Sequence, residues 1–170
     1  MPAKGRIYEI GSGFGVIGVY LAEKSKQREV IEVDINKKKL LQATSQTTLR
    51  NIQFIEGNAL TYRYKPHVGV VLSDFLHHLS FDDQIVTLER ISKKITKGGI
   101  VVIKEIDKGD GIFMLMSRLW DFIFYPYDDI YYRNVKDWKN IMQKLRFRVT
   151  ISREVRWFPG STYLFVCKKV

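Results

Sequence analysis

The 170-residue chain has one cysteine, no long hydrophobic run and no low-complexity segment. The single Cys167 excludes an internal disulfide framework and any zinc site built on cysteines. No stretch approaches the roughly 20 apolar residues that cross a bilayer, and no leader sequence precedes the first strand-like segment. We therefore expect a cytoplasmic protein without a membrane span or a metal site, folded as a single domain over residues 1–170.

Acidic residues are fewer than basic ones, and the formal net charge is +10. Such a charge favours encounter with anionic partners, so nucleic acid is one candidate partner. A high net charge also keeps many small domains in solution. Charge alone does not distinguish the two explanations.

A glycine-rich turn near the N-terminus organises the chain. Residues 7–10 are predicted to form a strand, Gly11, Gly13 and Gly15 follow at every second position, and residues 16–26 are predicted to form a helix. Glycine lets the backbone turn tightly and lets a ligand approach the main chain. The helix N-terminus adds free N–H donors and partial positive charge. A strand, a glycine turn and a helix in this order predict a nucleotide-binding loop.

Strands and helices alternate after this turn, which predicts βαβ units and a parallel sheet. Further short strands are expected at 29–34, 52–56, 68–74 and 100–103, and the last two are continuous apolar runs. Helices are expected at 36–49 and from Ser80, an N-cap candidate, to Gly98 and Gly99. Ligands of open α/β sheets bind at the carboxyl ends of the strands. The polar residues that follow these strands should therefore converge on one site.

Asp34 ends the second predicted strand. A carboxylate there can accept from both hydroxyls of a ribose, or it can cap the helix that follows. The same acid serves NAD-binding proteins, and the run from Gly13 to Gly18 matches the dinucleotide fingerprint G-x-G-x-x-G. Asp34 therefore predicts a bound ribose and leaves the cofactor open.

Counted from the strand end, Glu9-Ile-Gly11-Ser12-Gly13-Phe-Gly15 resembles the first motif of class I S-adenosylmethionine-dependent methyltransferases. The resemblance implies that Glu9 supports the loop near the methionine amino group. It also implies that the backbone from Gly11 through Ser12 and Gly13 to Gly15 passes beneath S-adenosyl-L-methionine. The plainer alternative is that Glu9 only caps nearby N–H groups.

The same resemblance assigns the adenine end of the cofactor. Asp34 would bind the ribose, and Ile35 would cover one face of the adenine. Asn58 and Ala59 stand where the family usually has an acid followed by alanine, and the Asn58 side-chain oxygen can still accept a hydrogen bond. Asn58 could equally be an ordinary turn residue.

The segment Ser73-Asp74-Phe75-Leu-His77-His78 follows the fourth predicted strand and resembles that of small-molecule methyltransferases. The resemblance implies that Ser73, Asp74 and Phe75 lie at the cofactor and that S-adenosyl-L-homocysteine is the product. Because adjacent side chains point different ways, one of His77 and His78 could take a proton from a hydroxyl acceptor. Either histidine could instead hold the loop by packing.

The C-terminal segment is predicted to be a hairpin, with an alternating strand over 147–157, a turn at Pro159 and Gly160, and an apolar strand over 163–166. An inner last strand beside an antiparallel edge strand resembles the seven-stranded class I methyltransferase sheet. We therefore expect a Rossmann-like, doubly wound, mostly parallel α/β sheet with an antiparallel C-terminal strand and helices on both faces.

Two segments should affect the acceptor site. Residues 109–134 contain a helix-like segment, 113–124, that is largely apolar, and are expected to form an insertion near it, although core packing would also explain this segment. The family usually has helices before the first strand, and about five residues precede it here. We expect an open site, or one covered by a partner or a second copy of the chain, or a reading frame that is truncated before these helices.

Three alternatives remain open at this stage. An RNA 2′-O-methyltransferase would use an Asp and a Lys that Asp74 and Lys104 match, but its second lysine and last acid have no good counterpart. A non-catalytic module could bind the cofactor without transferring the methyl group. An NAD-dependent enzyme would explain the glycine run and Asp34.

Overall fold

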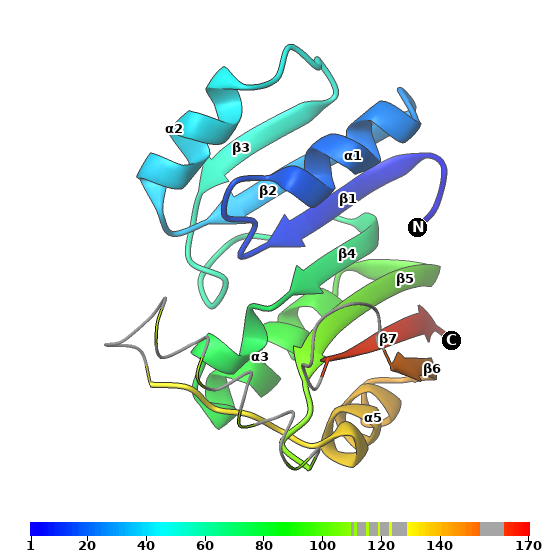
Figure 1. Cartoon of the computed structure of the whole chain (residues 1–170). Coiled ribbons are helices and arrows are strands. Elements are labelled where there is room, and N and C mark those ends of the chain that lie inside the picture. Colours follow the sequence, from blue (N-terminus) through cyan, green and yellow to red (C-terminus); the bar gives the residue numbers. More distant parts are fainter. Residues whose placement is uncertain (110, 112–114, 116–118, 120–122, 124–128, 154–161) are drawn as a thin grey trace.

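A seven-stranded sheet forms the centre of the computed structural model, which describes residues 1–109, 111, 115, 119, 123, 129–153 and 162–170 (Figure 1). The strand order is β3-β2-β1-β4-β5-β7-β6. The first five strands are parallel, and β7 runs antiparallel to both β5 and β6. The strands are β1 (Gly5–Ile10), β2 (Arg28–Asp34), β3 (Ile52–Glu56), β4 (His67–Ser73), β5 (Ile95–Ile106), β6 (Phe147–Arg153) and β7 (Thr162–Lys169).

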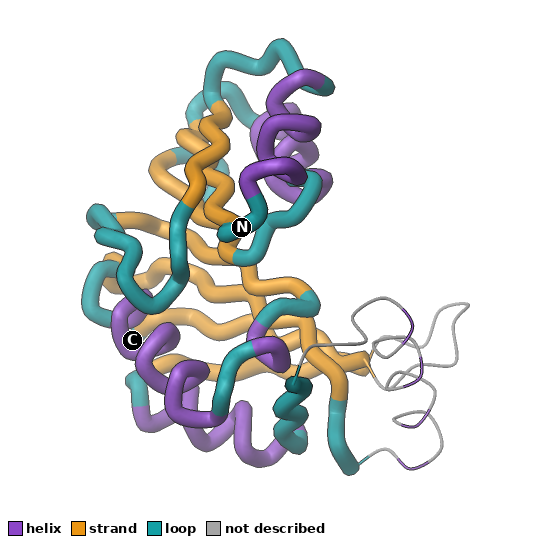
Figure 2. The backbone as a smooth tube through the Cα atoms, turned by 90° about the vertical axis from the view of Figure 1, so that its left-hand side faces the viewer, coloured by secondary structure: helices purple, strands orange, loops and turns teal. Residues whose placement is uncertain are grey.

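Helices cover both faces of the sheet (Figure 2). The helices α1 (Val16–Lys24) and α2 (Lys37–Ser45) lie on one side, and α3 (Phe81–Ser92) and α5 (Val135–Lys144) lie on the other. Alternation along β1 supplies both cores, since Ile7 packs with the α1 residue Leu21 and Tyr8 belongs to the cluster that contains Trp138 of α5. The doubly wound fold expected from the sequence is confirmed.

The strand order reverses between β1 and β4, the two strands that start the two halves of the sheet. Parallel strands leave the loops after β1, β2, β3 and β4 at one edge. A short 3-10 helix, η1 (Leu76–His78), follows β4 there. Such a reversal point is where open α/β sheets bind their ligands.

The helix α3 begins as predicted and ends earlier than predicted. Ser80 caps it, because the Asp83 N–H donates to Ser80 Oγ over 3.2 Å. The helix stops at Ser92, so the expectation that it continues to Gly98 and Gly99 was wrong. Ile95 already pairs with His67 in the sheet, and β5 passes through Gly98 in a left-handed conformation, beside an irregular register with β4.

The C-terminal strands confirm the predicted antiparallel hairpin, with β7 inside the sheet and β6 at its edge. The turn at Pro159 and Gly160 and most of the apolar segment 109–134 lie outside the described residues. None of the helices in the described ranges has the length and hydropathy needed to cross a bilayer.

Candidate functional site

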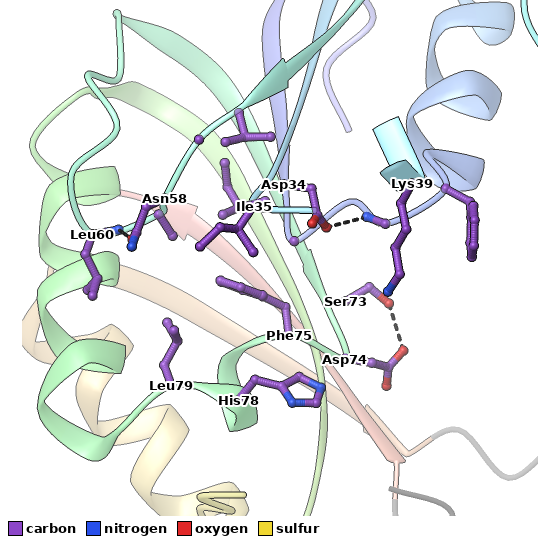
Figure 3. Close-up of a pocket in the computed structure, with 17 residues that line it drawn as sticks. Asp34, Ile35, Lys39, Asn58, Leu60, Ser73, Asp74, Phe75, His78 and Leu79 are labelled. Carbon is purple, nitrogen blue, oxygen red and sulfur yellow. Dashed lines mark hydrogen bonds between the residues drawn. The ribbon is translucent and has the colours of Figure 1, made fainter. Parts of the chain in front are cut away.

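A cavity of about 450 Å³ opens at the carboxyl ends of β1, β2, β3 and β4 (Figure 3). Its volume falls in the range of small-molecule sites. The cavity brings together these residues that the sequence assigned to the cofactor or to catalysis: Gly11, Gly13, Asp34, Ile35, Asn58, Ala59, Ser73, Asp74, Phe75 and His78. Glu9, Ser12, Gly15 and His77 do not line it.

The glycine loop is held from two sides. Gly11 has a φ of +70°, and a Cβ on it would lie 2.2 Å from a ring carbon of Phe75. Only glycine therefore lets this ring, which follows β4, lie against the loop that follows β1. On the other side the Gly13 N–H donates to Asp34 Oδ2 over 2.7 Å (Figure 3). These contacts preset the loop beside the cavity.

Asp34 is directed to the loop and the cavity. Its Oδ1 accepts from the Asn36 N–H over 2.7 Å, and Asn36 itself caps α2 by accepting from the Lys39 N–H over 3.2 Å. Helix capping thus falls to Asn36. Both Asp34 oxygens thus already accept from backbone N–H groups, and the carboxylate at the cavity wall keeps further acceptor capacity. Contact of Asp34 with a ribose stays a prediction.

Glu9 lies beneath the loop and is only 4% exposed. Its Oε2 accepts from the Gly18 N–H over 2.8 Å. The N-cap of α1 is Gly15, which has no side chain to do this, so Glu9 caps the helix from the neighbouring strand. This geometry agrees with the plainer of the two interpretations of the sequence, in which Glu9 caps nearby N–H groups. Contact of Glu9 with a methionine amino group stays a prediction.

Asn58 lines the cavity and also forms a turn. Its Oδ1 accepts from the Leu60 N–H over 2.8 Å. The acceptor that the sequence analysis assigned to adenine is therefore already shared with the backbone. Contact with an adenine amino group stays a prediction.

The two adjacent histidines lie in different surroundings. His78 lines the cavity, whereas His77 is 2% exposed and its Nδ1 forms a 2.6 Å hydrogen bond with Oε2 of Glu105. The other Glu105 oxygen accepts from the N–H groups of Phe75 and Leu76. His77 and Glu105 thus fix the loop that carries His78. Of the two base candidates, the structure positions only His78 at the cavity.

Polar groups gather where β4 and β5 end. The Ser73 hydroxyl donates to Asp74 Oδ2 over 3.0 Å, and the Lys104 ammonium also contacts this oxygen. Asp74 has a φ of 50°, which is uncommon for a residue other than glycine. Such outliers are often found at functional sites.

The sequence analysis missed several lining residues: Ile10, Phe14, Val33, Lys39, Gly57, Leu60 and Leu79. Lys39 carried a signal, because it is one of three lysines in the first turn of α2, where the helix dipole disfavours cations. Its ammonium lies 5.7 Å from the centre of the Phe14 ring. Glu105 carried no recognisable signal, because its partners come together only when β4 and β5 pair.

A family model described as a methyltransferase domain matches residues 7–99. The match contains the glycine loop, Asp34, Asn58 and the segment after β4. The chain belongs to the S-adenosylmethionine-dependent methyltransferase family. No curated protein matches the sequence of this chain.

Solved structures share its fold at low identity. The S-adenosylmethionine-dependent methyltransferase from Methanosarcina mazei is 17% identical with a TM-score of 0.78, over 100% of this chain and 94% of that one. A Haloferax volcanii methyltransferase in complex with the Trm112 activator is 13% identical with a TM-score of 0.82, over 99% and 84%. An O-methyltransferase family 2 protein from Planctomyces limnophilus, in complex with apigenin, is 14% identical with a TM-score of 0.80, over 100% and 55%.

The chain spans about half the length of the Planctomyces protein and of several other structures that it matches. The shared part contains the sheet and the loops at its carboxyl edge.

Proposed function

We propose that this chain binds S-adenosyl-L-methionine in the cavity at the carboxyl edge of β1 to β4 and transfers its methyl group to a small-molecule acceptor. The observation that carries the proposal is the meeting of the glycine loop, Asp34 and Asp74 around one cavity of about 450 Å³. The family match supports the choice of cofactor.

The lining residues suit the parts of this cofactor. Asp34 offers a carboxylate for the ribose hydroxyls, and the apolar Val33, Ile35 and Leu60 offer a surface for the adenine. Asn58 adds polar atoms beside them. When bound, the cofactor supplies an electrophilic methyl group, so the protein's task is alignment and exclusion of water.

His78 is our candidate for the general base. It lines the cavity, and the loop that carries it is fixed through the His77–Glu105 hydrogen bond. A neutral imidazole titrates near neutral pH and can accept the proton of a hydroxyl acceptor. The Planctomyces relative was solved with apigenin, which supports a small molecule as the acceptor.

An RNA acceptor is the second candidate, because two observations favour it. Lys104 contacts Asp74 at the cavity. A separate hollow of about 350 Å³ is basic, and its lining consists of Arg63, Tyr64, Arg90, Lys93 and Lys94. Cationic side chains that surround a hollow suit phosphate groups of a nucleic acid.

The deciding experiment measures transfer of a radiolabelled methyl group from S-adenosyl-L-methionine to hydroxylated aromatic compounds and, separately, to structured RNA. Methylation of a small molecule that falls in His78→Ala and persists in Lys104→Ala supports the first candidate. Methylation of RNA that Lys104→Ala abolishes supports the second. Cofactor binding without transfer to either class would favour a non-catalytic module, with or without a partner such as the activator of the Haloferax relative.

A further inference from the structure

Two glutamates lie side by side beneath the glycine loop. Glu9 of β1 and Glu32 of β2 are directly opposite in the parallel register, so both side chains project from the same face of the sheet, under α1. Glu9 is 4% exposed and Glu32 is 0% exposed. A buried pair of like-charged groups is costly unless something compensates it.

The fold makes room for Glu32. A Cβ on Gly18 would lie 1.6 Å from Glu32 Oε1, so the carboxyl fills the space that a side chain at position 18 would need. The backbone N–H of the same residue donates to Glu9. The first turn of α1 therefore accommodates both carboxyls: its Gly18 N–H donates to Glu9, and the missing Gly18 side chain leaves space for Glu32.

The chain supplies this pair with too few donors. Among the described residues, neither oxygen of Glu32 forms a hydrogen bond of normal geometry. The buried Ser12 hydroxyl lies near enough to lower the pKa of Glu32 but also lacks such a bond. Two ionised carboxylates can only accept, so neither can satisfy the other. One proton between them turns an acceptor into a donor and makes a hydrogen bond where none exists otherwise.

The surrounding charges favour that proton. In the described part of the chain, the charged groups that act on the pair are the two carboxyls themselves and Asp34, and none of them is basic. Burial raises the pKa of Glu9 to about 7, and burial together with the neighbouring Glu9 raises the pKa of Glu32 well above its ordinary value. The two groups therefore titrate as a unit.

We propose that Glu9 and Glu32 share one proton in the unliganded protein and that this proton is released when a cationic ligand occupies the cavity above them. Glu32 is then a positioning residue, which sets the charge beneath the loop without touching the ligand. The inference rests on the proposed function, because S-adenosyl-L-methionine is the cation in question, with a sulfonium and an ammonium group. A positive charge placed against the loop stabilises the ionised pair, and the proton passes to solvent.

The test is calorimetric titration of S-adenosyl-L-methionine into the whole chain at pH 7, in phosphate and in Tris. These buffers have different ionisation enthalpies, so the difference in observed heat gives the number of protons released. We expect release of up to one proton per site, with the number rising as the pH is lowered. Because binding releases the proton, affinity should increase with increasing pH, by up to about tenfold per pH unit in the range below pH 7.

Two variants separate proton sharing from a merely structural role. In Glu32→Gln the amide donates to an ionised Glu9, so we expect retained binding and almost no proton release. Glu29→Gln removes an exposed carboxylate from the same strand, where it pairs with Arg6, and should release the wild-type number. Ionisation of the ligand's own amine cancels, because every variant binds the same ligand.

Heats that do not differ between buffers in the wild type, or equal release in Glu32→Gln, would overturn the inference and leave the proposed function intact. Failure of the ligand to bind would remove the proposed function instead. Carbon-13 NMR titration of the glutamate carboxyls in the unliganded wild type decides about the shared proton even then. We expect a glutamate signal that titrates near neutral pH, and ordinary titration of every glutamate would contradict the proposal.

Discussion

Replacing Gly18 by alanine tests how α1 is seated on the sheet. Gly18 lies in the first turn of α1, where alanine is intrinsically favoured over glycine by about 1 kcal/mol. The new Cβ would nevertheless lie 1.6 Å from Glu32 Oε1, far inside the roughly 3.5 Å of an ordinary contact. Glu32 is fully buried in the inner strand β2, so a displaced carboxyl must disturb the packing around it.

The two effects can be compared in magnitude. Overpacking of a tightly filled interior costs about 1–3 kcal/mol, and the short distance at Gly18 places this case at the upper end. Subtracting the gain in helix propensity leaves Gly18→Ala less stable by about 2 kcal/mol. In a Glu32→Ala background the obstacle is gone, and the same change should stabilise by about 1 kcal/mol. The coupling between positions 18 and 32 should therefore be about 3 kcal/mol.

Urea unfolding of the wild type, the two single variants and the double variant gives this coupling directly. Gly13→Ala is the matched control, because its φ is +55° and a Cβ there meets nothing within 4 Å. That change should cost about 1–2 kcal/mol of left-handed strain, whether Glu32 is present or not. Additive effects at positions 18 and 32 would refute the account of how Glu32 is accommodated.

Three further predictions concern the same site. The folded protein keeps a proton on the pair of Glu9 and Glu32 that the unfolded chain loses above pH 4.5. The free energy of unfolding should therefore fall by about 1.4 kcal/mol per pH unit as the pH rises to about 7. Thermal melts of Glu32→Gln should show a smaller dependence on pH. Asp34→Ala should weaken S-adenosyl-L-homocysteine binding more than about tenfold, and Asp34→Asn, which keeps an acceptor for the loop, should weaken it less; equal losses would contradict this. His78→Ala should lower kcat without changing the dissociation constant of S-adenosyl-L-homocysteine, whereas His77→Ala should lower Tm; a reversed pattern would show that the roles are exchanged.

The sequence predicts the cavity well because strand ends are a topological property. Once β2, β3 and β4 are recognised as parallel, the residues at their carboxyl ends must meet at one edge, and Asp34, Asn58 and Asp74 do so. Local motifs and alternation were sufficient for this step. The inner position of β7 could also be predicted from local sequence, because its continuous apolar run requires burial on both faces of the sheet, and the structure confirms it.

Other features depend on register, which no local pattern records. Glu32 is one of several charged residues in β2, and its role appears only when β2 pairs with β1 and places it opposite Glu9. Gly18 matched a dinucleotide fingerprint, yet its missing side chain makes room for Glu32. The predicted end of α3 was wrong for a similar reason. Ile95 pairs with His67 of β4 and therefore belongs to β5, and no local pattern indicates this pairing.

The central claim is that the cavity at the carboxyl edge of β1 to β4 holds S-adenosyl-L-methionine. The most direct measurement is calorimetric binding of S-adenosyl-L-methionine, S-adenosyl-L-homocysteine and NAD to the wild type and to Asp34→Ala. We expect both sulfur-containing ligands to bind the wild type and to bind Asp34→Ala much more weakly. Titration of NAD should give no measurable heat of binding. Binding of NAD alone, or binding that is indifferent to Asp34, would contradict the account.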